Sequence, residues 1–246
     1  SGTNDNGNYR LSVSQLFQQG VVPNTKLGGT NVNFSGTLKL NKRWQVETSI
    51  NYDKQYTPNF PDATYQPSSP IYTLTLWTGG DYDVRDLRNY WQPGKVGTQQ
   101  RNVELYQYNN PYFTADHAGH GDDKDDIYGH IKLTFNINDH WNAFLRTSVS
   151  TWNTRQSQRY PISNSAYDGD GGYFMVGGYN QSTENFWDNN TDLLLNYKND
   201  FGKNFSLNAS AGAGLHTTTN DYFYAHTNNG ILIPQLFTVQ NSVNPP

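Results

Sequence analysis

Apolar and polar residues alternate along three similar stretches of the chain, and each stretch holds two runs joined by a short polar segment. The paired runs are 32–40 with 44–52, 131–137 with 141–149, and 193–197 with 205–211. In the first run, Val32, Phe34 and Leu38 would share one face of a strand, and polar residues would occupy the other. A period of two is typical of β-strands with one apolar face. The pattern therefore predicts three β-hairpins.

The same alternation along the rest of the chain predicts seven strands. They cover 9–17, 31–40, 44–56, 126–137, 141–152, 187–197 and 204–216. The polar, aromatic-rich segments between hairpins are interpreted as loops at 18–30, 57–125, 153–186 and 217–246. A long loop is unusual unless it has a function, so we expect 57–125 to be folded, with a short strand at 72–77 and a helical turn at 86–91.

Three features favour strands that cross a membrane over strands of a soluble sandwich. Several strands are near the roughly 9–11 residues that a tilted strand needs to cross a bilayer. Trp44, Trp141 and Phe205 stand where strands leave the short turns, as expected for an interfacial aromatic girdle. The apolar faces of four strands carry no charge, as lipid contact requires. Short turns at one end and long loops at the other are the plan of an outer-membrane β-barrel.

Composition agrees with a wall that is apolar on one face only. Hydrophobic residues make up 34% of the 246 residues, and the mean hydropathy is −0.82. Such polarity can indicate disorder, but a 15% share of aromatic residues argues against that interpretation. The expected fold class is all-β: a partial transmembrane antiparallel up-and-down β-barrel with long extracellular loops.

Charge and cysteine content exclude other classes. The net charge is −4, with 17 basic and 21 acidic side chains and no basic run, so we expect no nucleic-acid partner. Cysteine is absent, which excludes disulfide and thiol chemistry. No stretch approaches the roughly 20 apolar residues of a membrane helix. The polar first residues, 1–7, do not form a signal peptide, and we interpret both ends as cuts in a longer polypeptide. Seven strands do not close a bacterial barrel, so we expect further chain to complete it.

Ordered motifs carry a family resemblance. Residues 9–14 (YRLSVS), followed by 19–25 (QGVVPNT), resemble the early barrel of SusC-like TonB-dependent outer-membrane transporters. Residues 109–113 (NNPYF) resemble the "NNPYW" of that family's next long loop, with Phe113 in place of the Trp. Residues 192–197 and 205–212 resemble the following hairpin. The resemblance covers nearly the whole chain.

The resemblance implies a larger protein, of which residues 1–246 are one part. It implies a barrel of about 22 strands, closed by a plug and capped by a SusD-like surface lipoprotein, in the outer membrane of a Gram-negative bacterium. Import of an oligosaccharide, or alternatively of a peptide, would be driven by the TonB complex through the plug. Residues 1–246 would form the N-terminal part of the barrel wall, and their long loops would help to form the ligand vestibule.

Aromatic and charged residues of the longest loop are the candidate ligand contacts. Flat rings stack on sugars, and nearby charged groups bond hydroxyls. The candidates are Trp77, Asp81, Tyr82, Arg85, Tyr90, Trp91 and Tyr112. The alternative is that these side chains pack the loops together or contact the lipoprotein. The charged residues Arg10, Lys39, Glu47, Lys132 and Arg146, on the polar faces, are expected to pair with one another or with the plug.

Metal and catalytic signals are weak. The stretch 116–126 has ligand types suited to zinc, but its glycines and charges favour a flexible solvated loop. Residues 168–172 begin like a calcium loop without its closing ligands, so a tight turn is expected and calcium is the alternative. No catalytic motif is present, and we expect no enzyme and no cofactor. Rival hypotheses are a passive porin or adhesin barrel, a soluble carbohydrate-binding β protein and, more distantly, an outer-membrane hydrolase.

Overall fold

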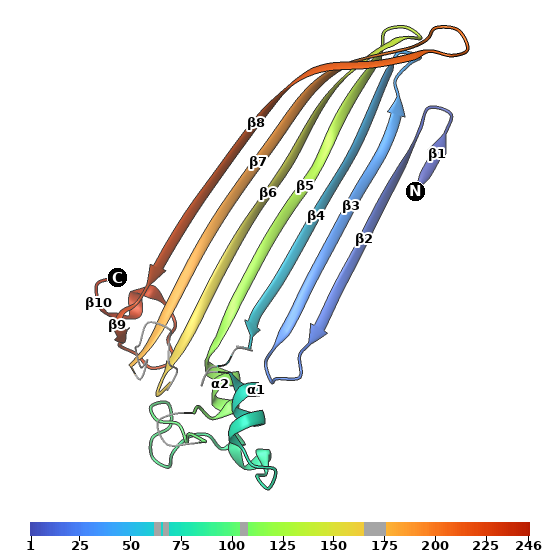
Figure 1. Cartoon of the computed structure of the whole chain (residues 1–246). Coiled ribbons are helices and arrows are strands. Elements are labelled where there is room, and N and C mark those ends of the chain that lie inside the picture. Colours follow the sequence, from blue (N-terminus) through green and yellow to red (C-terminus); the bar gives the residue numbers. More distant parts are fainter. Residues whose placement is uncertain (62–64, 66–68, 104–107, 165–175) are drawn as a thin grey trace.

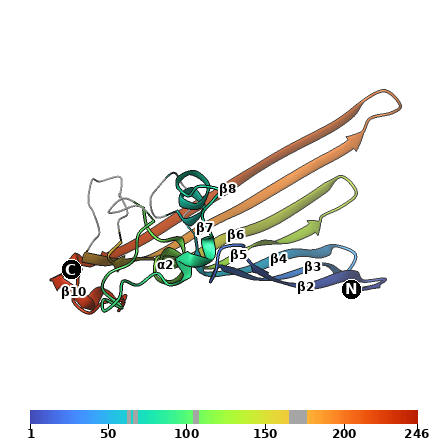
Figure 2. The same ribbon diagram turned by 90° about the horizontal axis from the view of Figure 1, so that it is seen from below.

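The computed structural model describes residues 1–61, 65, 69–103, 108–164 and 176–246. Within these residues, eight strands form one antiparallel sheet in chain order, and the sheet is a single curved layer (Figures 1 and 2). The strands are β1 (Gly2–Asn4), β2 (Gly7–Gln19), β3 (Lys26–Lys39), β4 (Trp44–Phe60), β5 (Gly119–Asn136), β6 (Trp141–Ile162), β7 (Val176–Asp200) and β8 (Ser206–His226). The expected all-β, up-and-down fold is confirmed, as a sheet that does not close on itself.

The other elements lie together at the end of the sheet opposite the short turns (Figure 1). They are α1 (Pro70–Tyr72), the π-helical turn η1 (Thr73–Trp77), the 3-10 helices η2 (Val84–Arg88) and η3 (Val239–Asn241), α2 (Pro111–His117), and the paired strands β9 (Asn228–Ile231) and β10 (Ser242–Asn244). Across the described ranges, no helix combines the length and apolar character needed to span a bilayer.

All seven predicted strands are present, but they extend further toward the long loops than predicted. β7 begins at Val176 instead of 187, and β8 ends at His226 instead of 216. The predicted loops 18–30, 57–125, 153–186 and 217–246 are therefore too wide at their strand-side ends. In these extensions polar residues occupy most positions, and the aromatic residues Tyr222, Phe223 and Tyr224 fall on both faces. No one-sided apolar pattern therefore marks the strand, while the backbone ladder continues unbroken from Asn180↔His226 to Asp200↔Ser206.

The expected strand at 72–77 is wrong, because this segment is helical. Ser69 accepts a hydrogen bond from the Tyr72 amide at 3.2 Å, and Pro70 occupies the first turn. An N-cap oxygen followed by proline favours a helix start over an extended strand. The helical turn expected at 86–91 is present slightly earlier, as η2.

The three predicted hairpins close with the same backbone contact. The amides of Leu40, Ile137 and Phe201 donate to the carbonyls of Trp44, Trp141 and Phe205 at 2.9, 2.9 and 2.7 Å. In the first two turns, an asparagine side chain also accepts from the amide of the following tryptophan, Asn41 at 3.0 Å and Asn138 at 2.9 Å. Such side-chain-to-backbone bonds are why asparagine favours tight turns. The repeated sequence unit is thus a repeated structural unit.

The strand register aligns apolar residues into continuous rows on one face, which we call the apolar face. One row contains Leu38, Val46, Leu133, Leu145, Leu193 and Ala213. These side chains have no protein layer over them: Leu145 is 48% exposed and Leu193 is 55% exposed. An apolar surface of this extent on an unpartnered sheet matches the lipid-facing wall of a membrane barrel.

Aromatic side chains border this apolar band at both ends. At the short-turn end, Trp44 stacks on Phe135 at 4.4 Å and Trp141 lies 4.7 Å from Tyr197. At the other end, Tyr52 and Trp187 share the same face. Trp44 and Tyr52 are about 27 Å apart along β4, at about 3.4 Å per residue. At the usual tilt this length corresponds to a height of about 21 Å, and two aromatic girdles with an apolar band between them are typical of outer-membrane barrels.

The opposite, polar face of the sheet is lined by hydrogen-bonded and charged side chains. Arg146 pairs with Asp192 at 2.7 Å, and Lys132 lies 3.9 Å from Glu47. The prediction that the five named charges pair with one another is confirmed for Lys132 and Glu47 only, because the partner of Arg146 is Asp192, which was not among them. Contact with a plug stays a prediction. Arg10 instead donates to Ser12 at 3.1 Å.

Candidate functional site

The helix α2 begins on the motif that resembles the transporter family. The Asn110 side chain accepts hydrogen bonds from the amides of Tyr112 and Phe113 at 3.0 and 3.3 Å, and Pro111 fills the first helical position. The side-chain nitrogen of Asn110, Nδ2, also donates to the Leu87 carbonyl at 3.0 Å. Asn110 is buried, so one side chain caps α2 and ties it to η2.

Buried amides join this loop to the end of β6. Gln100 donates to Asn109 at 2.8 Å and to the Ser163 carbonyl at 2.6 Å, and Asn109 donates to Asn164 at 2.6 Å. Gln100, Asn109 and Asn164 are each 1% exposed or less. Buried polar groups with several partners give a loop one defined conformation. The expectation that 57–125 is folded is confirmed for its described residues.

An aromatic cluster forms the core of the folded loop that contains η2 and α2, residues 84–103 and 108–118, which we call the loop platform. Tyr90, Trp91, Phe113 and His117 have ring centroids 5.3–6.0 Å apart, and the Tyr90 hydroxyl lies 3.2 Å from Nε2 of His117. Burial, followed by a hydrogen bond to Asp116, raises the pKa of Tyr90 to about 12. Burial also lowers the pKa of His117 below its usual 6.5, with Asp116 opposing that shift and Arg159 adding to it.

The lowered pKa of His117 predicts that the platform loosens in acid. The unfolded segment binds a proton more readily than the folded one, so the stabilisation is complete above about pH 6.5 and is lost as the pH falls below it. We expect hydrogen-exchange protection factors of α2 amides, corrected for intrinsic rates, to fall between pH 7 and pH 5. In His117→Gln this fall should be absent; an equal fall in the variant would contradict the assignment.

The seven candidate residues divide into packed and exposed groups. Tyr90 and Trp91 pack in the aromatic cluster, and Tyr112 lies under the Arg88 guanidinium at 5.8 Å. Arg85 is exposed and pairs with Asp83 at 2.6 Å. Trp77 stacks on Tyr108 at 4.4 Å yet keeps 45% of its surface exposed, and Tyr82 is 46% exposed. Asp81 is exposed as well. Ligand contact by these residues stays a prediction.

A groove of about 250 Å³ opens on the polar face beside the loop platform. It is lined by residues of β4 to β8, including Phe60, His120, Gln158, Asn180, Tyr222 and Tyr224. Phe60 and His120 stack at 5.1 Å, and the Tyr222 ring is 63% exposed. Tyr224 is 49% exposed, so its phenol can hydrogen-bond a ligand. Exposed rings beside amides can stack on, and hydrogen-bond, an elongated polar ligand.

Further aromatic residues continue from this groove along the polar face, toward the short-turn end. Trp152 of β6 stacks on Phe186 of β7 at 5.2 Å, with the Lys124 ammonium 5.6 Å from the Trp152 ring. Register places this pair two residues nearer the short turns than the Thr154 and Glu184 pair, and four nearer than Gln156 and Ser182 of the groove. The polar face thus offers stacking surfaces at successive heights of the wall.

Sequence reasoning missed the polar-face groove because its residues lie in the segments predicted as loops. Phe60, His120, Tyr222 and Tyr224 were each placed outside the seven strands. One signal could have found the last two: Tyr222 and Tyr224 have the spacing of two residues that puts side chains on one face of a strand.

Neither metal hypothesis gains support. The stretch 116–126 forms the end of α2 and the start of β5, so its interpretation as a flexible loop is wrong; its glycines sit within a paired ladder. No group of three potential metal ligands occurs among the residues that the structure describes. The calcium-like stretch 168–172 lies outside those residues.

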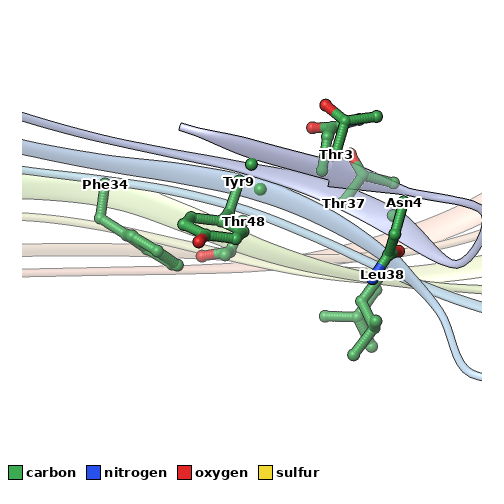
Figure 3. Close-up of a pocket in the computed structure, with 12 residues that line it drawn as sticks. Thr3, Asn4, Tyr9, Phe34, Thr37, Leu38 and Thr48 are labelled. Atoms are coloured by element: carbon green, nitrogen blue, oxygen red, sulfur yellow. The ribbon is translucent and has the colours of Figure 1, made fainter.

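A second hollow, of about 610 Å³, lies near the N-terminal hairpin. Figure 3 shows Tyr9, Phe34 and Thr48 from three adjacent strands at this hollow, with Leu38 on the opposite side of the ribbon from Thr37. Gly36 contributes no side chain there. Because Tyr9, Phe34 and Leu38 belong to rows of the apolar face, this hollow is part of that face.

Comparison with known proteins supports the fold. No protein-family model and no curated protein matches the sequence. Two solved structures of similar fold are the RagAB peptide importer in its open-open state and the RagAB peptide transporter, each with a TM-score of 0.66. Identity is 12% and 13%, over 97% and 99% of this chain. The matches cover 25% and 26% of those chains, so this chain spans about a quarter of their length. The likeness shows the fold: an antiparallel, up-and-down β-sheet like that of part of those chains.

Proposed function

We propose that this chain is part of the wall of a TonB-dependent, SusC-like importer of nutrient oligomers in the outer membrane of a Gram-negative bacterium. The main support is the sheet itself. One face carries an apolar band bordered by aromatic residues, and the other is a polar surface with an aromatic groove. The first face suits lipid and the second suits a wet lumen. The family resemblance of residues 9–25 and 109–113 adds TonB dependence to the proposal.

The ligand we propose is an elongated oligomer, a glycan or a peptide. The sequence resemblance favours a glycan, whereas the solved structures of similar fold are of a peptide importer. The groove suits both, because exposed tyrosines stack on sugar rings and on side chains, and Gln158 and Asn180 bond hydroxyl or peptide groups. No catalytic step is assigned to it.

The proposed partner above the wall is a SusD-like surface lipoprotein. Exposed apolar side chains occur along residues 71–84, which hold α1, η1 and the start of η2: Ile71, Leu76, Trp77, Tyr82 and Val84 are 37–63% exposed. Aromatic and aliphatic side chains are typical of the centre of a protein interface. The TonB complex would act through a plug supplied by other residues of the polypeptide.

Uptake by cells tests this proposal directly. Cells that carry the full-length protein should accumulate a fluorescent oligosaccharide or oligopeptide, and cells that lack TonB should not. Uptake that persists without TonB would favour the passive porin. Recovery of the protein in the aqueous fraction without detergent would favour the soluble carbohydrate-binding alternative and overturn the proposal.

Removing the groove tyrosines should weaken ligand capture. In the full-length protein, Tyr222→Ala and Tyr224→Ala should each raise the Kd of the imported oligomer roughly 2- to 12-fold, because one stacking contact contributes about 0.5–1.5 kcal/mol. The matched control is Phe223→Ala, on the opposite face of β8 and 60% exposed. Equal weakening in all three variants would contradict the groove.

A further inference from the structure

Another groove lies on the outer side of the same wall, beyond the apolar band. It measures about 490 Å³ and is lined by Tyr56, Asp123, Arg155, Tyr179, Gln181 and Thr183, among others. Strand parity puts these six side chains on the apolar face: Tyr56 pairs with Asp123, Asp123 with Arg155, and Arg155 with Thr183. We call this the outer groove. It lies on the opposite face from the Tyr222 and Tyr224 rings.

The distance of the outer groove from the apolar band determines which part of a lipid could reach it. Tyr56 follows the girdle residue Tyr52 by four positions, or about 13 Å along the strand and about 10 Å of height at the usual tilt. The headgroup layer of a phospholipid adds only about 5–8 Å to each side of the hydrocarbon core. A phospholipid headgroup would therefore end below most of the groove, whereas a lipid that carries several sugars would fill it.

The lining offers aromatic ring faces and charged groups that hydrogen-bond hydroxyls. Tyr56 is 46% exposed and offers a ring face, as does the half-buried Tyr179. Lys54 is paired with Asp123 and, at 2.8 Å, with Asp125, which also accepts from the Tyr52 hydroxyl at 2.6 Å. Both carboxylates are therefore held in place on the outer face, where they can accept hydroxyls, while Lys54 and Arg155 balance their charge.

Gly121 lines the floor of the groove. A Cβ on Gly121 would lie 2.7 Å from the Ser157 hydroxyl and 3.4 Å from the Pro58 carbonyl. The first of these atoms ends a short side chain that can rotate away, so the absence of a side chain at Gly121 widens the hollow without being essential to it.

We propose that the outer groove binds the saccharide portion of an outer-leaflet glycolipid whose acyl chains cover the adjoining apolar band. The proposal rests on the outer-membrane location of the proposed function, but it concerns the outside of the wall and not the transported ligand. Continuity between band and groove on one face is what selects a lipid-anchored sugar over a soluble one.

Retention of glycolipid by the full-length protein tests the proposal. The protein is purified from outer membranes in mild detergent, and bound lipid is quantified by mass spectrometry. The probes are lipopolysaccharide from the same cells, the polysaccharide cleaved from its lipid, and phosphatidylethanolamine. We expect wild type to retain lipopolysaccharide in preference to both others, and the double variant Arg155→Gln/Tyr179→Ala to retain at least about 10-fold less, since stacking and a charged hydrogen bond are lost. Gln55→Ala, exposed on the polar face beside Tyr56, should retain as much as wild type.

Several results would overturn the outer groove as a glycolipid site. They are equal retention by the double variant, preference for phosphatidylethanolamine, equal binding of the cleaved polysaccharide, or a change in oligomeric state in place of lipid loss. Oligomer uptake is measured in the same strains. If wild-type cells take up no oligomer, the proposed function alone is refuted. If uptake is normal and the double variant retains as much lipid as wild type, the outer groove alone is refuted.

Discussion

Leu145→Arg should destabilise the folded, membrane-inserted protein by about 2–4 kcal/mol. Leu145 lies near the middle of the apolar band, between Leu133 and Leu193 on the neighbouring strands. It is 48% exposed on a face with no protein cover, so an arginine there would lie in hydrocarbon. Denaturant titration of the full-length protein in phospholipid vesicles, followed by heat-modifiable gel mobility, measures the loss.

Ser148→Arg is the matched control for this prediction. Ser148 lies three residues along the same strand but on the polar face, where its hydroxyl donates to the Asn190 carbonyl at 3.3 Å. An arginine there would face water, so we expect a change within about 1 kcal/mol. Equal destabilisation by the two arginines would mean that the apolar face does not contact lipid.

Asn110→Ala should unfold the loop platform locally. The substitution removes the N-cap of α2, which contributes about 0.5–2 kcal/mol, and leaves the buried Leu87 carbonyl without its donor, at a cost of about 1–3 kcal/mol. Limited proteolysis and hydrogen exchange of residues 108–118 should show a loss of about 2–4 kcal/mol in local opening free energy. Global stability of the sheet should change little, because β4 and β5 keep their ladder.

An exposed cap supplies the control. Asp83 caps η2 through the Arg85 amide at 2.9 Å, but it is exposed and holds no other element in place. Asp83→Ala should therefore cost no more than about 1 kcal/mol, and protection at 108–118 should be unchanged. If Asn110→Ala behaved like Asp83→Ala, the platform would not depend on the buried amide network.

The candidate site could be anticipated only in part. The sequence marked the aromatic-rich loop, but it could not separate Tyr90, which packs against Phe113, from Tyr82, which stays exposed, since both are tyrosines in polar surroundings. The polar-face groove was missed because Phe60 and Tyr222 are 162 positions apart and meet only through three intervening strands.

Local chemistry determined the hairpins of this protein from the sequence alone. Alternation of period two, asparagine-closed turns and the aromatics that follow them are properties of neighbouring residues, and they set the number, order and short-turn ends of the seven long strands. The tertiary structure decided where those strands end and what meets across them. Beyond the girdle, apolar and aromatic residues no longer keep to one face. Interstrand hydrogen bonding, rather than a one-sided hydrophobic pattern, carries β7 and β8 onward and brings the rings of the two grooves together.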